Sequence, residues 1–346
     1  MQVSAPGKLI LTGEYAVLDG APGLVMAINR RARVGLEPSN DKAWHLVSRQ
    51  DQLSTCSFTL DEQGLPRWDE PDSKSAFHLV DTLLRASREL ALHKLPPFRA
   101  TLDTSEFFDP GAGGQKLGLG SSAALTVALS SALHDWANIP PLPQGEQLAK
   151  LLAMHRDFQG GHGSGIDLAA SLCGGVLDYQ RTPGSPSPRV EPLTLPGALK
   201  FRAIWTGKQA STSELLRQLE TASEADPSGW SQVQRILASA AIRSRNACIS
   251  GQVEELILSI AAYGKALRLL QAFSGIQVYS PEHETLAELA SKQGITYKPS
   301  GAGAGDLGLA FSLDPAALAQ FCSEAARAGF GCPDLAIETR GLARHD

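Results

Sequence analysis

The sequence has no long apolar run and no excess of basic residues, and its first 30 residues do not show the pattern of a secretory leader. About 18 consecutive apolar residues would be needed to suggest a membrane span, and no such run occurs. Residues 1–30 contain no basic segment followed by an apolar one, so no signal peptide is expected. The net charge of −5 argues against a nucleic-acid-binding protein, which usually carries a basic face. We therefore expect a soluble, cytoplasmic protein without a membrane or nucleic-acid partner.

Paired cysteine motifs and a P-loop are also absent. The five cysteines are scattered and show no Cys-x-x-Cys spacing, so neither a structural zinc site nor a disulfide framework is expected. The Gly-x-x-x-x-Gly-Lys-[Ser/Thr] pattern of P-loop enzymes occurs nowhere. Because the overall charge is acidic, a phosphate-bearing ligand must be held by some other local cluster of residues.

The length and the composition indicate two α+β domains. A chain of 346 residues favours two domains, since single hydrophobic cores rarely grow beyond about 250–300 residues. The proline-rich residues 181–199 suit a connection between them. We place the domains at residues 1–185 and 186–346. Strands mixed with helices in both halves, without regular alternation, predict the α+β class.

Local patterns predict individual strands and helices. Residues 7–18 are predicted to form a pair of strands interrupted at Gly13, and residues 335–338 a final strand. Apolar spacing and helix propensity predict helices over residues 75–94, 121–136, 144–158 and 282–293 and within 211–272.

The first of three glycine-rich segments covers residues 118–124, Gly-Leu-Gly-Ser-Ser-Ala-Ala, immediately before a predicted helix. A helix N-terminus carries free N–H groups and a partial positive charge, and glycines allow an anion to approach them. A tight turn with Ser121 as helix cap is the alternative. The segment also fits a dinucleotide-binding pattern, but a polar loop precedes it and Asn138 lies near the position where an acidic residue is expected, so we reject that interpretation.

Two further glycine-rich segments end in aspartates. Residues 160–167 end at Asp167, which could orient a hydroxyl or take its proton, or could open a short helix. Residues 298–306 alternate glycine with alanine up to Asp306. That pattern suits either an anion-binding nest or a plain turn.

Taken together and in this order, the segments resemble the motifs of the GHMP kinase superfamily, named for galactokinase, homoserine kinase, mevalonate kinase and phosphomevalonate kinase. Residues 6–17 look like its first motif, residues 118–124 its second and residues 300–306 its third. The resemblance covers essentially the whole chain. It implies a ribosomal S5 domain 2-like N-terminal domain and a ferredoxin-like C-terminal domain, with ATP and an acceptor bound in the cleft between them.

Four details are similar to the phosphomevalonate kinase branch: Lys116 and the segments 159–167, 205–212 and 298–306. Mevalonate kinases carry a metal-binding glutamate where this chain has Arg156. The resemblance therefore implies ATP-dependent phosphorylation of mevalonate 5-phosphate in the mevalonate pathway of isoprenoid synthesis.

The resemblance also implies residue roles. Lys8, Lys116 and Asp167 are the expected catalytic residues, with Asp167 acting as a base or by pairing with Lys8. Ser121 or Ser122 would contribute a hydroxyl ligand to Mg²⁺. His155 and Arg156 could instead bind the acceptor phosphate or be structural. The ATP phosphates are expected at Gly118, Leu119, Gly120, Ser121, Ser122 and Ala123, and the acceptor at Ser164, Gly165, Lys208, Ser211, Thr212, Ser300, Gly301, Ala302 and Gly303.

Two alternatives stay open at this point. One is mevalonate kinase or another small-molecule kinase of the superfamily. The other is a non-catalytic ligand sensor, although such a protein would be expected to have lost a phosphate-handling residue, and Lys8, Ser121, Ser122 and Asp167 are all present. The sequence leaves the oligomeric state open, with a homodimer as one option.

Overall fold

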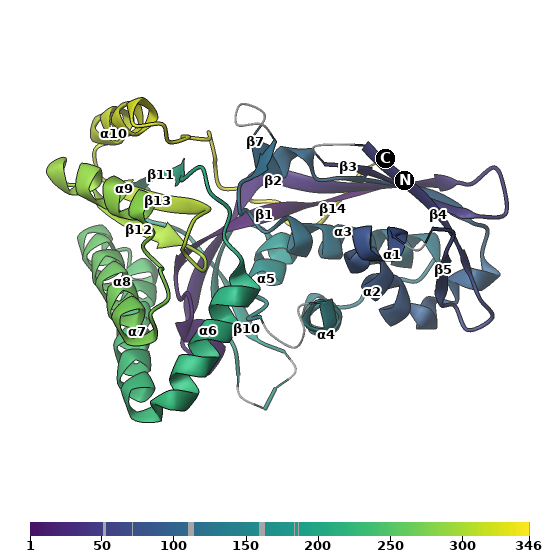
Figure 1. Ribbon diagram of the computed structural model, residues 1–346, viewed down its shortest axis with the longest axis horizontal. Helices are drawn as coiled ribbons and strands as arrows, with labels where there is room; N and C mark the ends of the chain where they lie inside the picture. The colour runs from purple at the N-terminus through teal and green to yellow at the C-terminus, as the bar shows by residue number, and fades with distance from the viewer. Residues whose placement is uncertain are drawn as a thin grey trace.

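The computed structural model describes residues 1–50, 53–70, 72–109, 114–158, 163–182, 184–185 and 187–345, apart from the side chains of residues 53 and 157. Within these residues the chain forms a large sheet with helices on one face and, beside it, a smaller sheet accompanied by long helices (Figure 1). The arrangement confirms the expected α+β class.

The large sheet has nine strands in the described part of the chain, in the order β10-β9-β2-β6-β3-β4-β5, with β1 between β2 and β14. All of its pairs are antiparallel except β3 with β6. Its strands are β1 (Gln2–Thr12), β2 (Gly23–Pro38), β3 (Trp44–Arg49), β4 (Leu53–Leu60), β5 (Pro66–Trp68), β6 (Phe98–Asp103), β9 (Val176–Gln180), β10 (Arg189–Leu193) and β14 (Ala343–His345).

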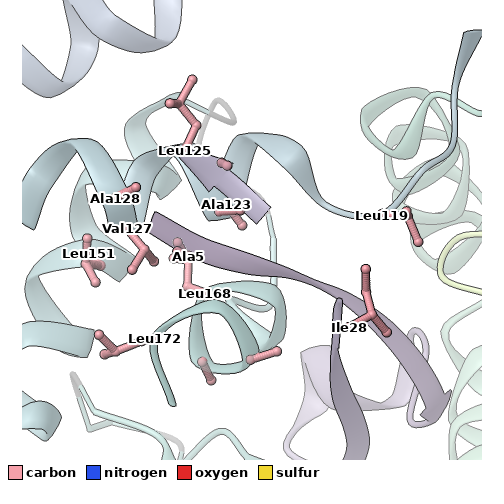
Figure 2. Packing of buried hydrophobic residues seen from close by; sticks show 14 of the residues in the cluster. Ala5, Ile28, Leu119, Ala123, Leu125, Val127, Ala128, Leu151, Leu168 and Leu172 are labelled. Carbon is pink, nitrogen blue, oxygen red and sulfur yellow. The ribbon is translucent and has the colours of Figure 1, made fainter. Parts of the chain in front are cut away.

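Two helices pack closely on β1 and β2, namely α3 (Ser121–Trp136) and α5 (Ile166–Cys173). Ala123, Ala124 and Ala128 of α3 are fully buried, and their small side chains let the helix lie close to the sheet. Figure 2 shows Ala5 of β1 in the same cluster as Val127 of α3 and residues of α5. This packing fixes the N-terminal ends of both helices relative to β1. Outside them lie α1 (Ser73–Ala76), α2 (His78–Ala86) and α4 (Gln144–Phe158), together with the small strand pair β7 (Phe108–Asp109) and β8 (Gln115–Lys116).

The smaller sheet has the order β11-β13-β12 and is antiparallel throughout. Helices α9 and α10 cover one face around Phe321, while α6, α7 and α8 form a second cluster around Tyr263. The elements are β11 (Lys200–Trp205), α6 (Thr212–Ala225), α7 (Pro227–Ile249), α8 (Val253–Ser274), α9 (Pro281–Lys292), β12 (Thr296–Ser300), β13 (Leu307–Ser312) and α10 (Pro315–Arg327).

In the described part of the chain, one helix, α8, has the length and the apolar composition that a membrane span would need. Leu256, Ile260, Tyr263, Leu267 and Leu270 are buried against the rest of the protein. This pattern is typical of a core helix in a globular protein.

Several sequence-based predictions match the structure and others do not. The helices predicted at 121–136 and 144–158 coincide with α3 and α4. The second strand predicted within residues 7–18 is wrong, because Gly13 and Tyr15 have positive φ angles and a 3-10 turn (Ala16–Asp19) follows. The predicted strand at 335–338 forms only one isolated bridge, between Ile28 and Ile337.

The predicted helix over 75–94 is divided. It begins as α1 and α2, which ends at Ala86, and continues as two 3-10 turns, Arg88–Leu90 and Leu92–Lys94. Ala91, in the left-handed region between those turns, prevents a continuous helix. The domain limits at 185 and 186 stay a prediction, and both β10 and β14 lie in the large sheet.

A buried ion pair joins the two sheets. Glu14 follows β1, Lys298 lies on β12, and their side chains meet at 2.5 Å with 1% and 0% exposure. Burial lowers the pKa of the Lys298 ammonium, and the Glu14 carboxylate opposes that shift. Because an isolated charge in the interior is very costly, each group depends on the other for its burial.

Removing one partner of this pair should destabilise the protein more than removing both charges. We expect Lys298→Met to lower the free energy of unfolding by about 3–5 kcal/mol, because Glu14 is left buried and unpaired. The double variant Glu14→Gln, Lys298→Met should recover part of that loss. Urea unfolding measures both, with Arg217→Met at an exposed pair as a control that should change little. A double variant that loses as much stability as Lys298→Met and Glu14→Gln lose together when each is measured alone would contradict this interpretation.

Candidate active site

A cavity of about 280 Å³ lies between the large sheet and the smaller one. Its walls come from β1, the N-terminal ends of α3 and α5, the start of α6 and the loop after β12. All three glycine-rich segments therefore contribute to one cavity. Of the predicted site residues, those that line it are Lys8, Lys116, Gly118, Gly120, Ser121, Ser122, Ser164, Asp167, Thr212, Ser300, Gly301 and Ala302.

The loop before α3 needs glycine at two positions. Gly118 and Gly120 have φ angles of 76° and 79°, in the left-handed region that favours glycine. A Cβ on Gly118 would lie 2.3 Å from the Asp306 carboxyl carbon, and one on Gly120 would lie 3.2 Å from the Lys8 side chain. The absence of side chains thus allows Asp306 and Lys8 to approach the loop. The helix that follows is 16 residues long, and the Gly120 cap provides no side-chain hydrogen bond to its first N–H groups. Those N–H groups are free to bind an anion.

Two lysines and an aspartate lie around this loop. The Lys8 Nζ donates to the Gly118 carbonyl at 3.4 Å. Burial lowers the pKa of Lys116; nearby Asp306 opposes this shift, and Lys8 adds to it. Burial raises the pKa of Asp306, and the N–H of Ala210 and the two lysines oppose that shift. Two cations beside one carboxylate leave net positive charge next to the helix N-terminus, which suits a phosphate group.

Asp306 was not among the residues predicted for the site. Its Oδ1 accepts from the Ala210 N–H at 3.3 Å, its own N–H donates to the Lys208 carbonyl at 2.7 Å, and its carbonyl accepts from Thr206. It therefore connects the third glycine segment to residues 206–210 and to the loop before α3. The signal was available, because Asp306 ends its glycine segment just as Asp167 ends another.

Asp167 lies in the first turn of α5, where its Oδ1 accepts from the Leu168 N–H at 3.0 Å. It lines the cavity together with Lys8. Among the described residues no ion pair joins the two side chains, so the predicted pairing of Asp167 with Lys8 is not present in this structure. The carboxylate is instead directed by the helix backbone.

The loop after β12 is held by β1 and the turn that follows it. The Ser300 hydroxyl donates to the Ile10 carbonyl and accepts from the Ile10 N–H, both at 3.0 Å. The Ala302 carbonyl accepts from the Tyr15 hydroxyl at 2.5 Å. These contacts occupy the Ser300 side chain, so this loop presents mainly backbone to the cavity.

Other predicted site residues lie outside the cavity lining. The side chains of Leu119 and Ala123 are fully buried in the core, so any contact they make to a ligand would involve their backbone.

The remaining predicted residues are exposed or are glycines packed against other segments. Lys208 is 60% exposed and its side chain pairs with Glu282 at 2.5 Å. Ser211 is the exposed residue before α6. Gly165 and Gly303 have positive φ angles, and a Cβ on them would overlap Leu152 and Val278.

His155 and Arg156, the two residues considered for the acceptor phosphate, have different surroundings in the structure. His155 is 2% exposed and its ring lies tilted against that of Phe158, with 5.6 Å between the ring centroids, so it is not available to a ligand. Arg156 is exposed and lines a neighbouring cavity. Residues 159–162, the first part of the segment compared with the phosphomevalonate kinase branch, lie outside the described residues.

Comparison with known proteins finds similarity to GHMP kinases in a family model, in related sequences and in fold. The model of the GHMP kinases N terminal domain matches residues 83–175. The phosphomevalonate kinase of Streptomyces sp. (strain CL190) is 28% identical over 336 residues, covering 88% of both chains. The mevalonate kinase of Bos taurus is 29% identical over 259 residues, covering 63% of this chain and 62% of that one. The structure of Streptococcus pneumoniae phosphomevalonate kinase in complex with phosphomevalonate and AMPPNP superimposes with a TM-score of 0.79 at 20% identity, over 97% of this chain and 99% of that one.

We expect Gly118→Ala to abolish detectable ATP binding in a calorimetric titration. The added Cβ would strain a left-handed backbone and displace Asp306 from the loop. The matched control is Gly145→Ala in α4, where a Cβ meets nothing within 4 Å. That variant should bind ATP normally and be slightly stabilised, because alanine favours the helix. Wild-type affinity in Gly118→Ala would show that this loop does not bind the nucleotide.

Proposed function

We propose that the chain is a GHMP kinase that transfers the γ-phosphate of ATP to mevalonate 5-phosphate, giving ADP and mevalonate 5-diphosphate. The observation that carries this proposal is that Lys8, Lys116, the N-terminus of α3 and Asp167 face one cavity. Similarity to a phosphomevalonate kinase over 88% of the chain supports the choice of acceptor.

ATP would lie with its phosphates against the backbone of residues 118–122. Phosphoryl transfer requires the protein mainly to position the groups and to stabilise charge on the transferring phosphate. The N–H groups at the start of α3 supply fixed donors, and Lys8 and Lys116 supply positive charge. Since both lysines lie around the same loop, they can act on the same phosphate.

The acceptor oxygen of mevalonate 5-phosphate belongs to a phosphate whose second pKa is about 6, so it is already ionised near neutral pH. A strong base is then less necessary than it would be for an alcohol. In this proposal Asp167 helps to place the acceptor, and Lys8 offsets the repulsion between the two phosphates.

Magnesium fits the oxygen donors of this cavity. Mg²⁺ prefers oxygen ligands and usually binds through one or two protein groups together with substrate phosphates. The hydroxyls of Ser121 and Ser122 and the carboxylate of Asp167 all line the cavity, whereas no group of three or more His, Cys, Asp or Glu side chains suited to a metal occurs among the described residues. Ser121 and Ser122 would hold the ion, which when bound neutralises charge on the β- and γ-phosphates.

The expected partners are small molecules, ATP and mevalonate 5-phosphate, in the cytoplasm. No nucleic acid or membrane partner is proposed, and a homodimer stays a prediction. Mevalonate is the main alternative acceptor, because a mevalonate kinase is also among the relatives. A non-catalytic sensor would bind these ligands without turnover.

A coupled assay of ADP release with Mg-ATP tests the acceptor. It is run in parallel on mevalonate 5-phosphate, mevalonate, homoserine and galactose. We expect turnover on mevalonate 5-phosphate only. Turnover on mevalonate alone would overturn the acceptor and keep the kinase activity. ATP binding without turnover on any of the four would favour the sensor.

Two charge-removing variants test whether Lys8 stabilises charge and whether Asp167 acts as a base. We expect Lys8→Met to lower kcat about 100–1000-fold, because a charge that stabilises the transferring phosphate is lost. Asp167→Asn should lower kcat less than about 10-fold, because an ionised phosphate needs no base. Lys265→Met, at an exposed residue of α8, is the control. A loss in Asp167→Asn that equals or exceeds the loss in Lys8→Met would instead assign proton abstraction to Asp167.

A further inference from the structure

A second cavity, of about 370 Å³, adjoins the active-site cavity. Leu18 and Ser164 line both, so the two cavities meet at these residues. The second cavity is bounded by the end of α4, the end of β9 and the turn after η1 (Ala16–Asp19). Asp167, which lines the first cavity, is three residues from the shared residue Ser164.

Two arginines face this second cavity. Arg156 lies in the last turn of α4, and Arg181 directly follows β9. Arg181 Nη1 donates to the Leu18 carbonyl at 3.2 Å, which leaves most of the five guanidinium N–H groups for a ligand. Neither arginine forms an ion pair within the described part of the chain, although the exposed Asp19 also lines the cavity. The pair thus has the charge to bind an anion.

Tyr179 lines the second cavity and contacts Ser164, which lines both cavities. Its buried hydroxyl donates to the Ser164 carbonyl at 2.5 Å. Burial and the charge of Asp167 raise the pKa of Tyr179, whereas Arg181 and Arg156 oppose that shift. The tyrosine therefore lies within electrostatic range of the catalytic carboxylate on one side and of both arginines on the other.

The chemistry of the acceptor determines what reaches the second cavity. In the proposed reaction the phosphate of mevalonate 5-phosphate is the attacking group, so it must lie beside Lys8 and Asp167. The opposite end of its five-carbon chain carries a carboxylate, which points away from the transferred phosphate. Guanidinium groups bind carboxylates in a bidentate, charge-assisted manner.

We propose that Arg156 and Arg181 bind the carboxylate of the acceptor in the second cavity while its phosphate lies in the first. This inference rests on the proposed function. It makes the two arginines specificity-determining residues, because an acceptor without an anion at its far end would leave two positive charges unpaired. Because they act away from the reacting atoms, their contribution should appear in KM more than in kcat.

The test compares mevalonate 5-phosphate with its carboxamide, which keeps the shape but loses the charge. In the wild type we expect the amide to have a KM about 10–100-fold higher, the range for a charge-assisted hydrogen bond. Arg156→Met and Arg181→Met should each raise the KM for the acid, with kcat within about threefold of wild type, and should bring the acid and the amide close to equal KM values. Arg181→Lys should retain part of the preference for the acid. Arg327→Met, at an exposed residue of α10 outside both cavities, should behave as wild type.

Each further outcome decides the question. An unchanged preference for the acid in both methionine variants of an active enzyme overturns this inference and leaves the proposed function intact. A fall in kcat with the preference unchanged assigns the arginines a structural role, as the contact of Arg181 with Leu18 would allow, and also overturns the inference. A wild type with no turnover on mevalonate 5-phosphate overturns the proposed function and the inference together.

Discussion

The buried pair of Glu14 and Lys298 is the constraint on which the active site depends. It joins the turn after β1, the strand that carries Lys8, to β12, the strand that leads into the third glycine segment. The Ser300 hydroxyl and the Tyr15 hydroxyl add neutral hydrogen bonds across the same junction. Since neither charge can remain buried without the other, the two sheets cannot separate at this point without a large loss of stability. The cavity between them therefore has fixed walls.

Two glycines of the loop before α3 allow charged side chains to approach that loop. Gly118 makes room for the Asp306 carboxyl, and Gly120 for the Lys8 side chain. Asp306 in turn lies close enough to Lys8 and Lys116 for the three charges to influence one another. A single carboxylate between two ammonium groups reduces their mutual repulsion while the net charge stays positive. The cluster can thus be stable without a ligand and still attract the phosphates of one.

Local sequence patterns correctly predicted helices whose formation depends mainly on residues close together in the sequence. Both α3 and α4 begin and end where apolar spacing and propensity placed them. The second strand predicted within residues 7–18 was wrong because its apolar residues serve a turn packed against another element, and alternation alone does not reveal positive φ angles. The position of Asp306 at the end of a glycine segment was visible in the sequence, but its contacts were not, since its partners at residues 8, 116 and 210 are far away in the sequence.

The sequence by itself determined the family resemblance and the three glycine segments, because glycine and serine directly before a helix meet the local backbone requirements of an anion-binding loop. It also determined which charged side chains were candidates for the active site. Only the tertiary structure decided which of them share a cavity. It turned the Ser300 hydroxyl and the Lys208 ammonium toward protein groups, and it placed Arg156 and Arg181 in the lining of one second cavity. The physical reason is that side-chain direction depends on packing between distant segments, and that packing is set by the whole core rather than by neighbours along the chain.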